Sequence, residues 1–219
     1  MIADGERIAI GLSGGKDSLT LCRILKERIR HVPVNYELTA IYIDPGFEKS
    51  FAKDLEKYCK RLKIQLVVEH TDNGLVAHST KNRENPCFLC SRLRRKRLFE
   101  IAESIGARKI ALGHHKDDII ETLFLNMFYS GEISTMSPRQ ELFKGAMTII
   151  RPLAFLDEHK INKFSQMMDF PVFENPCPSS NRSKRHEIKE MLLKLYRSNR
   201  KIKGNIFRAM HHVKLDYLL

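Results

Sequence analysis

The sequence lacks any apolar run of the roughly 18–20 residues that a membrane-spanning helix requires. Its first residues also lack the basic and then apolar pattern of an export signal. From these two absences we expect a cytoplasmic protein without a membrane partner. The chain has no internal repeat and no low-complexity tract, and its 219 residues suffice for one α/β domain with a full core.

Cysteines are few, and their number is odd. Without an export signal, an odd number argues against a disulfide framework and leaves metal binding or redox chemistry for the cysteines outside the core. Cys22 and Cys59 stand at helical spacing from leucines, so we expect both in the core. The five cysteines are Cys22, Cys59, Cys87, Cys90 and Cys177.

Acidic residues are the minority among the charged ones. The 26 Asp and Glu residues stand against 38 Lys and Arg residues, which gives a net charge of +12. A basic excess of this size favours a polyanionic partner, and nucleic acid is the simplest such partner.

Short apolar runs alternate with helical patterns along most of the chain. This alternation predicts βαβ units and a doubly wound, mostly parallel sheet in an α/β fold. We expect the main domain to cover residues 1–175 and a basic helical extension, residues 176–219, to pack on the same domain. Residues 71–86 and 131–145 are expected to be irregular. The predicted strands cover residues 7–12, 37–44, 64–69, 109–113 and 148–152, and the predicted helices cover residues 18–29, 47–62, 91–105, 118–129 and 157–168.

A glycine-rich loop joins the first predicted strand to the first predicted helix. Its glycines allow a tight turn close to a ligand, and the free amides at the helix start form an anion site. Its serines can donate to phosphate oxygens, its lysine adds positive charge, and its aspartate suits Mg²⁺ beside a pyrophosphate. The spacing is neither the Walker pattern nor the dinucleotide pattern, and the alternative is a plain strand-to-helix turn. The loop reads Ser13-Gly14-Gly15-Lys16-Asp17-Ser18.

Cys87 and Cys90 form a C-x-x-C pair where a helix is predicted to open, amid several arginines. Two thiolates at this spacing bind one metal ion or two corners of an iron–sulfur cluster, or they form a redox disulfide. The helix dipole is expected to lower the pKa of both thiols. Cys177, between two prolines, is the candidate third ligand. Three ligands would leave one position open for chemistry, whereas His186 as a fourth would make a structural zinc site.

The loop after the fourth predicted strand, residues 113–118, carries two adjacent carboxylates, Asp117 and Asp118. Ligands of doubly wound sheets bind at this carboxyl edge, where carboxylates can hold Mg²⁺ or orient a base. Either aspartate can also cap the following helix, and Asp118 is the expected cap. A zinc site on His114 and His115 is disfavoured because adjacent side chains point apart. His114 is instead a candidate for nucleotide binding.

Three more charged residues are placed near the same edge by the predicted elements. Asp44 ends the second predicted strand, where it would contact adenosine or metal, or else form the turn before Pro45-Gly46. Arg94 lies one turn after Cys90 and is expected to reach a nucleotide phosphate or RNA. Arg151 is a second candidate for the same role.

These motifs carry a family resemblance. Residues 12–18 resemble the PP-loop signature of the N-type ATP pyrophosphatases, whose adenine-nucleotide α-hydrolase-like fold is a doubly wound sheet. Further stretches resemble the TtcA-type tRNA 2-thiocytidine synthetases and their shorter relatives. These stretches are P-C-F-L-C-S-R-L-R-R at residues 86–95, residues 111–129, I-R-P-L at residues 150–153, and N-P-C-P at residues 175–178 with residues 184–189.

The resemblance implies an ATP-dependent tRNA sulfurtransferase that adenylates the C2 carbonyl of cytidine 32 and then replaces its oxygen with sulfur. It implies ATP, Mg²⁺ and a 4Fe-4S cluster on Cys87, Cys90 and Cys177, with Asp117 near the reacting base. A persulfide on Cys87 or Cys90 is the competing sulfur carrier. The implied partners are tRNA, a sulfur donor (a cysteine desulfurase or inorganic sulfide) and a second copy in a homodimer.

Three alternatives remain open at this point. A uridine thiolase or a lysidine-synthetase-like ligase would share the nucleotide chemistry. The sequence lacks the zinc-ribbon cysteines of uridine-type relatives, and a ligase needs no cysteine trio, so the cytidine type is favoured. A non-catalytic RNA-binding protein with zinc or a redox disulfide belongs to a different class and would turn over no ATP.

Overall fold

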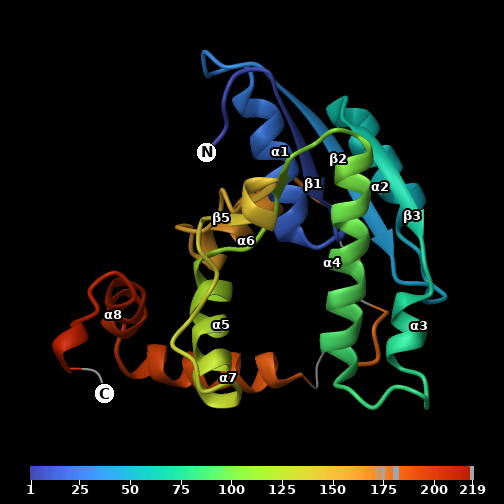
Figure 1. Cartoon of the computed structure of the whole chain (residues 1–219). Helices are drawn as coiled ribbons and strands as arrows, with labels where there is room; N and C mark the ends of the chain where they lie inside the picture. The colour runs from blue at the N-terminus through green and yellow to red at the C-terminus, as the bar shows by residue number, and fades with distance from the viewer. Residues whose placement is uncertain (172, 174–175, 180–182, 218–219) are drawn as a thin grey trace.

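The structure of the protein is a computed structural model, which describes residues 1–171, 173, 176–179 and 183–217 (Figure 1). Its six strands form one sheet in the order β3-β2-β1-β4-β6-β5. Neighbouring strands are parallel except β5, which pairs antiparallel with β6 at the edge. The predicted mostly parallel α/β sheet is confirmed. The strands are β1 (Glu6–Gly11), β2 (Tyr36–Asp44), β3 (Gln65–His70), β4 (Lys109–Ala111), β5 (Arg139–Leu142) and β6 (Met147–Ile150).

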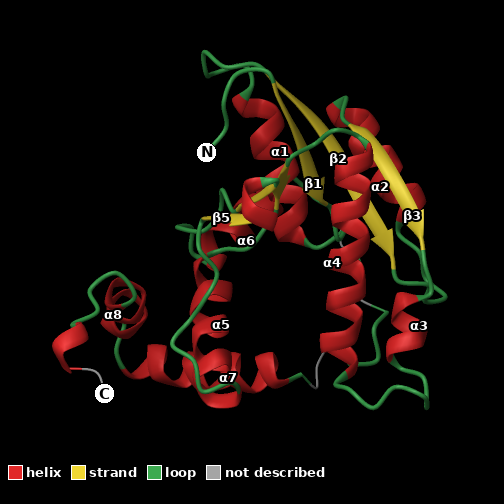
Figure 2. Cartoon of the chain, in the orientation of Figure 1, coloured by secondary structure: helices red, strands yellow, loops and turns green. Residues whose placement is uncertain are grey.

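Both faces of the sheet are buried under helices, which surround the strands in Figure 2. Because side chains alternate along a strand, Ile8 and Ile10 pack on one face with α1, α2 and α6. Ala9 and Ile41 pack on the other face with Ile101 of α4. The helices are α1 (Lys16–Arg28), α2 (Ala52–Leu62), α3 (Asn73–Ala77), α4 (Pro86–Ser104), α5 (Lys116–Tyr129), α6 (Glu158–Met167), α7 (Lys184–Ser198) and α8 (Lys201–Ala209).

The basic C-terminal region forms α7 and α8. Helix α7 packs across α5 through Ile120, Ile188 and Leu192, which are all buried, and α8 lies beside them (Figure 1). The predicted domain boundary at residue 175 falls outside the described residues. No helix in the described part of the chain is long and apolar enough to cross a membrane.

Three local predictions need correction. Residues 139–142, expected in a loop, form the edge strand β5, which is too polar to show an apolar alternation. The segment expected to be irregular between β3 and the cysteine pair contains the short helix α3. Helix α4 begins at Pro86 rather than near Ser91, because Asn85 caps it by accepting hydrogen bonds from the amides of Cys87 and Phe88.

Candidate functional site

A cavity of about 630 Å³ lies at the carboxyl edge of the sheet, where β1, β2 and β4 end. Ligands of doubly wound sheets bind at this edge. The glycine-rich loop, α4, the start of α5 and the β5–β6 hairpin all contribute to the wall, and α7 contributes Arg185. The charged and polar side chains of the wall include Ser13, Asp17, Ser18, Arg94, Arg95, His114, Asp118, Gln140, Arg151 and Arg185.

The glycine-rich loop has the geometry of an anion site. Gly14 adopts a φ of +84°, which glycine accepts without strain. Ser18 folds back over the loop: its hydroxyl donates to the carbonyl of Gly15 at 2.9 Å and accepts from the amide of Ser13 at 3.2 Å. Gly15 provides no side-chain cap for α1, so the first amides of this helix are left for a ligand.

Lys16 points toward α6 and not into the cavity wall. Its ammonium lies 3.1 Å from Glu158 and 3.2 Å from Asp17. The loop itself contributes Ser13, Asp17 and Ser18 to the wall. Three of the predicted loop residues therefore face the cavity, whereas Lys16 is held outside its wall by Glu158 and Asp17.

Gly113 sets the distance between the glycine-rich loop and the loop that precedes α5. A Cβ at this position would lie 2.9 Å from the carbonyl carbon of Asp17 and 3.0 Å from the amide nitrogen of Ser18. Both neighbours are backbone atoms and cannot move aside alone. Only glycine lets the glycine-rich loop and the loop before α5 pack this closely.

One buried polar atom of the wall, Nε of Arg94, lacks a hydrogen-bond partner among the described residues. Oδ1 of Asp17 accepts no well-aligned hydrogen bond, but it lies 3.2 Å from the ammonium of Lys16 and is therefore paired. An unsatisfied buried polar atom costs about 1–3 kcal/mol, so Nε of Arg94 at a cavity wall indicates a ligand. A carboxylate oxygen suits a divalent cation, and a guanidinium suits a phosphate.

Asp118, and not Asp117, lines the cavity. The carboxylate of Asp118, in the first turn of α5, accepts from the amide of the N-cap residue His115 at 3.0 Å, so Asp118 has the expected capping role as part of a capping box. Asp117 faces the other way: Oδ1 lies 2.6 Å from the ammonium of Lys203, and Oδ2 accepts from the amide of Glu158 at 2.8 Å. The geometry thus favours Asp118 for contact with a bound substrate.

His114 and Arg151 form a pair in the wall. The guanidinium of Arg151 donates through Nε to Nδ1 of His114 at 3.3 Å, and through Nη1 to the carbonyl of Ser137. Burial lowers the pKa of His114 to about 4, and the charge of Arg151 acts in the same direction, against that of Asp118. His114 is therefore neutral near pH 7 and accepts a hydrogen bond at Nδ1.

Asp44 forms the turn before Pro45-Gly46, which was the predicted alternative to a nucleotide contact. It is buried, its Oδ1 accepts from the amide of Gly46 at 3.0 Å, and its Oδ2 accepts from the hydroxyl of Ser50. The second strand contributes Ile41 and Ile43 to the cavity wall instead.

The three candidate metal-binding cysteines come close enough to influence one another. Burial raises the pKa of Cys87, and the neighbouring sulfur of Cys177 raises it further. Burial also raises the pKa of Cys90, against the charge of Arg94 and together with the other two sulfurs. The predicted lowering of the pKa of these thiols at the helix start is therefore wrong for the free protein, since burial and mutual repulsion outweigh the dipole.

The surroundings of Cys177 add a residue that the sequence did not single out. Its sulfur lies 3.9 Å from Nε2 of His78, which also contacts the hydroxyl of Ser179 at 2.9 Å. His186, the predicted alternative ligand, is exposed on the first turn of α7. Within the described residues, no three Cys, His, Asp or Glu side chains lie in the geometry of a bound metal ion.

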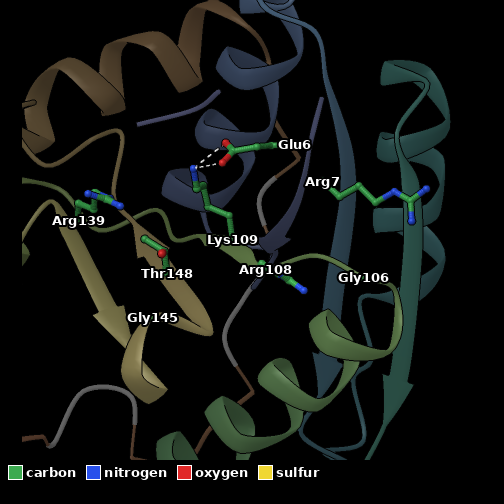
Figure 3. A pocket seen from close by; sticks show the side chains of 8 residues that line it. All are labelled: Glu6, Arg7, Gly106, Arg108, Lys109, Arg139, Gly145 and Thr148. Carbon is green, nitrogen blue, oxygen red and sulfur yellow. Dashed lines mark hydrogen bonds and ion pairs between the residues drawn. The ribbon is translucent and has the colours of Figure 1, made fainter. Parts of the chain in front are cut away.

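A smaller cavity, about 260 Å³, lies at the amino ends of β1, β4 and β6 (Figure 3). There Glu6 and the ammonium of Lys109 face each other at 2.6 Å, with Arg139 and Thr148 nearby. This edge is opposite to the glycine-rich loop, whereas ligands of doubly wound sheets bind at the carboxyl edge. The 630 Å³ cavity at the carboxyl edge is therefore the better candidate site.

The comparison with known families agrees with this geometry. Residues 3–196 match the PP-loop domain family. The chain belongs to the PP-loop family. Within this family it resembles the tRNA-cytidine(32) 2-sulfurtransferase of Polynucleobacter necessarius, with 38% identity over 100% of this chain and 73% of that protein. It is 37% identical to the enzyme of that name from Geobacter sulfurreducens, over 100% of this chain and 86% of that protein.

Solved PP-loop structures share the fold. The U34-tRNA thiolase NcsA from Methanococcus maripaludis, solved with its 4Fe-4S cluster, aligns with a TM-score of 0.79 and 25% identity over 99% of this chain and 74% of that chain. An NH3-dependent NAD synthetase from Campylobacter jejuni aligns with a TM-score of 0.54 at 13% identity, which shows the fold alone. The predicted family and PP-loop fold are confirmed.

Gly113→Ala tests the packing of the two loops. The added methyl group collides with backbone atoms, so we expect a loss of roughly 1–3 kcal/mol of stability and at least a tenfold weaker binding of ATP. Calorimetric titration with ATP and thermal unfolding measure both effects. The control is Gly204→Ala in α8, where a Cβ meets nothing within 4 Å. Unchanged ATP affinity in Gly113→Ala would contradict the role given to this contact.

His114→Gln tests the buried neutral histidine. The unfolded chain binds a proton at this histidine below about pH 6.5, whereas the folded protein does so only below its pKa of about 4. The native protein therefore loses stability as the pH falls from 6.5 to 4, and the variant should lose less. Urea unfolding across this window checks the difference, with the exposed His31→Gln as control. Parallel curves for the wild type and His114→Gln would refute it.

Proposed function

We propose that this chain is an ATP-dependent tRNA sulfurtransferase, which adenylates the C2 carbonyl of a cytidine and replaces the oxygen with sulfur. One observation carries the proposal: α4, which bears Cys87 and Cys90 in its first two turns, also supplies Arg94 to the cavity that the glycine-rich loop lines. A nucleotide pocket and a thiol cluster thus share one helix. The relatives named tRNA-cytidine(32) 2-sulfurtransferase support the choice of substrate.

The first chemical half takes place at the glycine-rich loop. The amides at the start of α1 and the hydroxyls of Ser13 and Ser18 bind the phosphates, and Asp17 supplies an oxygen for Mg²⁺. The carbonyl oxygen of the base attacks the α-phosphate, pyrophosphate leaves, and the base carries AMP. This step turns the oxygen into a good leaving group. Arg94 offsets the negative charge that develops on the phosphate.

Asp118 is the residue we assign to the reacting base. It faces the cavity from the start of α5, and its capping hydrogen bond fixes its orientation. A carboxylate in this position accepts a hydrogen bond from the exocyclic amine of cytosine and so orients the ring for attack. Asp117, which the sequence favoured for this role, keeps α5 tied to α6 and α8.

The second half requires a sulfur atom at the activated carbon. Cys87, Cys90 and Cys177 would hold a 4Fe-4S cluster, which when bound supplies an open iron site for that sulfur. The donor set fits in kind, because a cluster of this type takes cysteine ligands, the start of α4 places Cys87 and Cys90 one turn apart, and all three cysteines are only partly buried. The sulfur donor, either a cysteine desulfurase or inorganic sulfide, and assembly into a homodimer are further parts of the proposal.

Asp118→Asn and Asp117→Asn separate the roles of the two aspartates. We expect Asp118→Asn to lower the kcat for 2-thiocytidine formation by roughly 10-fold, because a neutral amide oxygen is a weaker acceptor for the exocyclic amine than a carboxylate. The melting temperature should be nearly unchanged, because the amide oxygen can still accept from the amide of His115. Asp117→Asn should lower the melting temperature, because it weakens the ion pair with Lys203, and Lys203→Met should reproduce that effect. Mass spectrometry of tRNA nucleosides after single turnovers measures the product. If the Asp118→Asn variant is active and the Asp117→Asn variant is stable but inactive, Asp117 and not Asp118 is the residue that contacts the base.

Cys177→Ser tests the metal centre. We expect anaerobically reconstituted Cys177→Ser to lose most of its iron and sulfide and to form no thionucleoside, because only two thiolates remain. Cys22→Ala, which removes a buried core thiol, should keep its iron. Wild-type protein that is fully active with bound zinc and no iron would contradict the proposed iron–sulfur cluster. A 2-thiouridine product from wild-type protein would point instead to the uridine thiolases.

A further inference from the structure

A groove of about 690 Å³ runs along α4 on the side of the β5–β6 hairpin and belongs to no site described above. We name it the α4 groove. Three aromatic side chains and three cationic ones line it, and two glutamates stand further along the helix. These residues are Phe88, Phe99, Phe143, Arg92, Arg95, Lys96, Glu100 and Glu103.

Two of the aromatic side chains are exposed to an unusual degree. Phe88 is 59% exposed and Phe143 is 64% exposed. Phe143 sits in the turn between β5 and β6 and meets Phe99 edge to face, with ring centroids 5.5 Å apart. Exposed aromatic rings that line one groove are typical of an interaction site. Of the two, Phe88 already has the guanidinium of Arg92 over its ring, so Phe143 is the better surface for a flat ring.

The cationic side chains give the groove a charged end. The guanidinium of Arg92 lies 5.5 Å from the centre of the Phe88 ring and also pairs with Glu84 at 2.9 Å. Arg95 makes no ion pair within the described part of the chain. Glu100 is paired with Arg97 at 2.8 Å, which offsets its charge. An anionic ligand is therefore favoured at the end of the groove that holds Arg92 and Arg95.

The α4 groove adjoins the nucleotide cavity. Ser91 and Arg95 line both, so one turn of α4 is the wall between them. A polymer with one unit in the cavity could place its next unit in the groove. A nucleic-acid strand consists of flat bases joined by phosphates. The protein offers surfaces in the same order: the cavity for one base, the guanidinium of Arg95 for a phosphate, and the exposed aromatic rings for the next base.

We propose that the α4 groove binds an unpaired nucleotide of the tRNA substrate, next along the strand to the one that reacts. Its base stacks on Phe143, which lies against Phe99 of α4, and Arg95 contacts its phosphate from the turn of α4 shared with the cavity. The inference rests on the proposed function, since it assumes that the reacting base enters the cavity. It adds a site that holds the strand in register without reading the base by hydrogen bonds.

Phe143→Ala tests the site. This side chain is exposed, and its ring contact is with Phe99 rather than with a cysteine, so the fold and the iron content should persist; both are measured on the variant. Loss of one stacked base should raise the Kd for tRNA by roughly 10-fold or more, while the affinity for ATP stays unchanged. Phe143→Trp should keep tight binding, because a larger ring still stacks. Met167→Ala, at an exposed apolar position on α6, is the control and should bind as wild type.

A photocrosslinking amino acid, p-benzoylphenylalanine, placed at position 143 identifies the occupant. A crosslink to the nucleotide beside the modified cytidine supports the proposal. Wild-type affinity of Phe143→Ala, or a crosslink only to a second copy of the chain, overturns it. If wild-type protein forms no thionucleoside, the proposed function fails, but the effect of Phe143→Ala on the Kd still decides whether the groove binds tRNA.

Discussion

The close approach of two backbone segments, made possible by the absence of a side chain at Gly113, is the constraint on which the site depends. It brings the glycine-rich loop after β1 against the loop after β4, so that Ser18 and Asp118 face one cavity. In the proposed reaction, the α-phosphate of ATP and the carbonyl oxygen of the base must meet within bonding distance, and flexible loops would not hold them there. Rigid packing of backbone on backbone supplies that precision.

A chain of buried and half-buried charges extends this constraint to the C-terminal helices. Glu158 binds both Lys16 of the glycine-rich loop and Lys189 of α7, at 3.1 and 2.9 Å. Burial alone would raise the pKa of Glu158, but the hydrogen bonds and charges of these two lysines lower it to about 2. Lys203 of α8 joins Asp117 to Asp157 in the same way. The nucleotide loop is thus braced by helices distant in sequence.

Sequence patterns were enough to predict those features that depend on residues close together in the chain. The apolar run of β1 ending in glycines predicts the anion loop, and the cap at Asn85 explains why the cysteine pair opens α4. Sequence patterns were not enough to predict features that depend on packing between segments far apart in the chain. Which of two adjacent aspartates faces the cavity depends on Lys203, many residues later in the chain. The edge strand β5 exists only because β6 offers it hydrogen bonds, and His78 meets Cys177 only through the fold.

An anaerobic crystal structure of the reconstituted protein with a non-hydrolysable ATP analogue tests the central claim most directly. The account predicts the phosphates on the loop of residues 13–18, iron on the three cysteines, and an open path from the α-phosphate to that iron through one cavity. Phosphates bound instead at the opposite edge near Lys109, or a four-ligand zinc site closed off from the nucleotide, would contradict it.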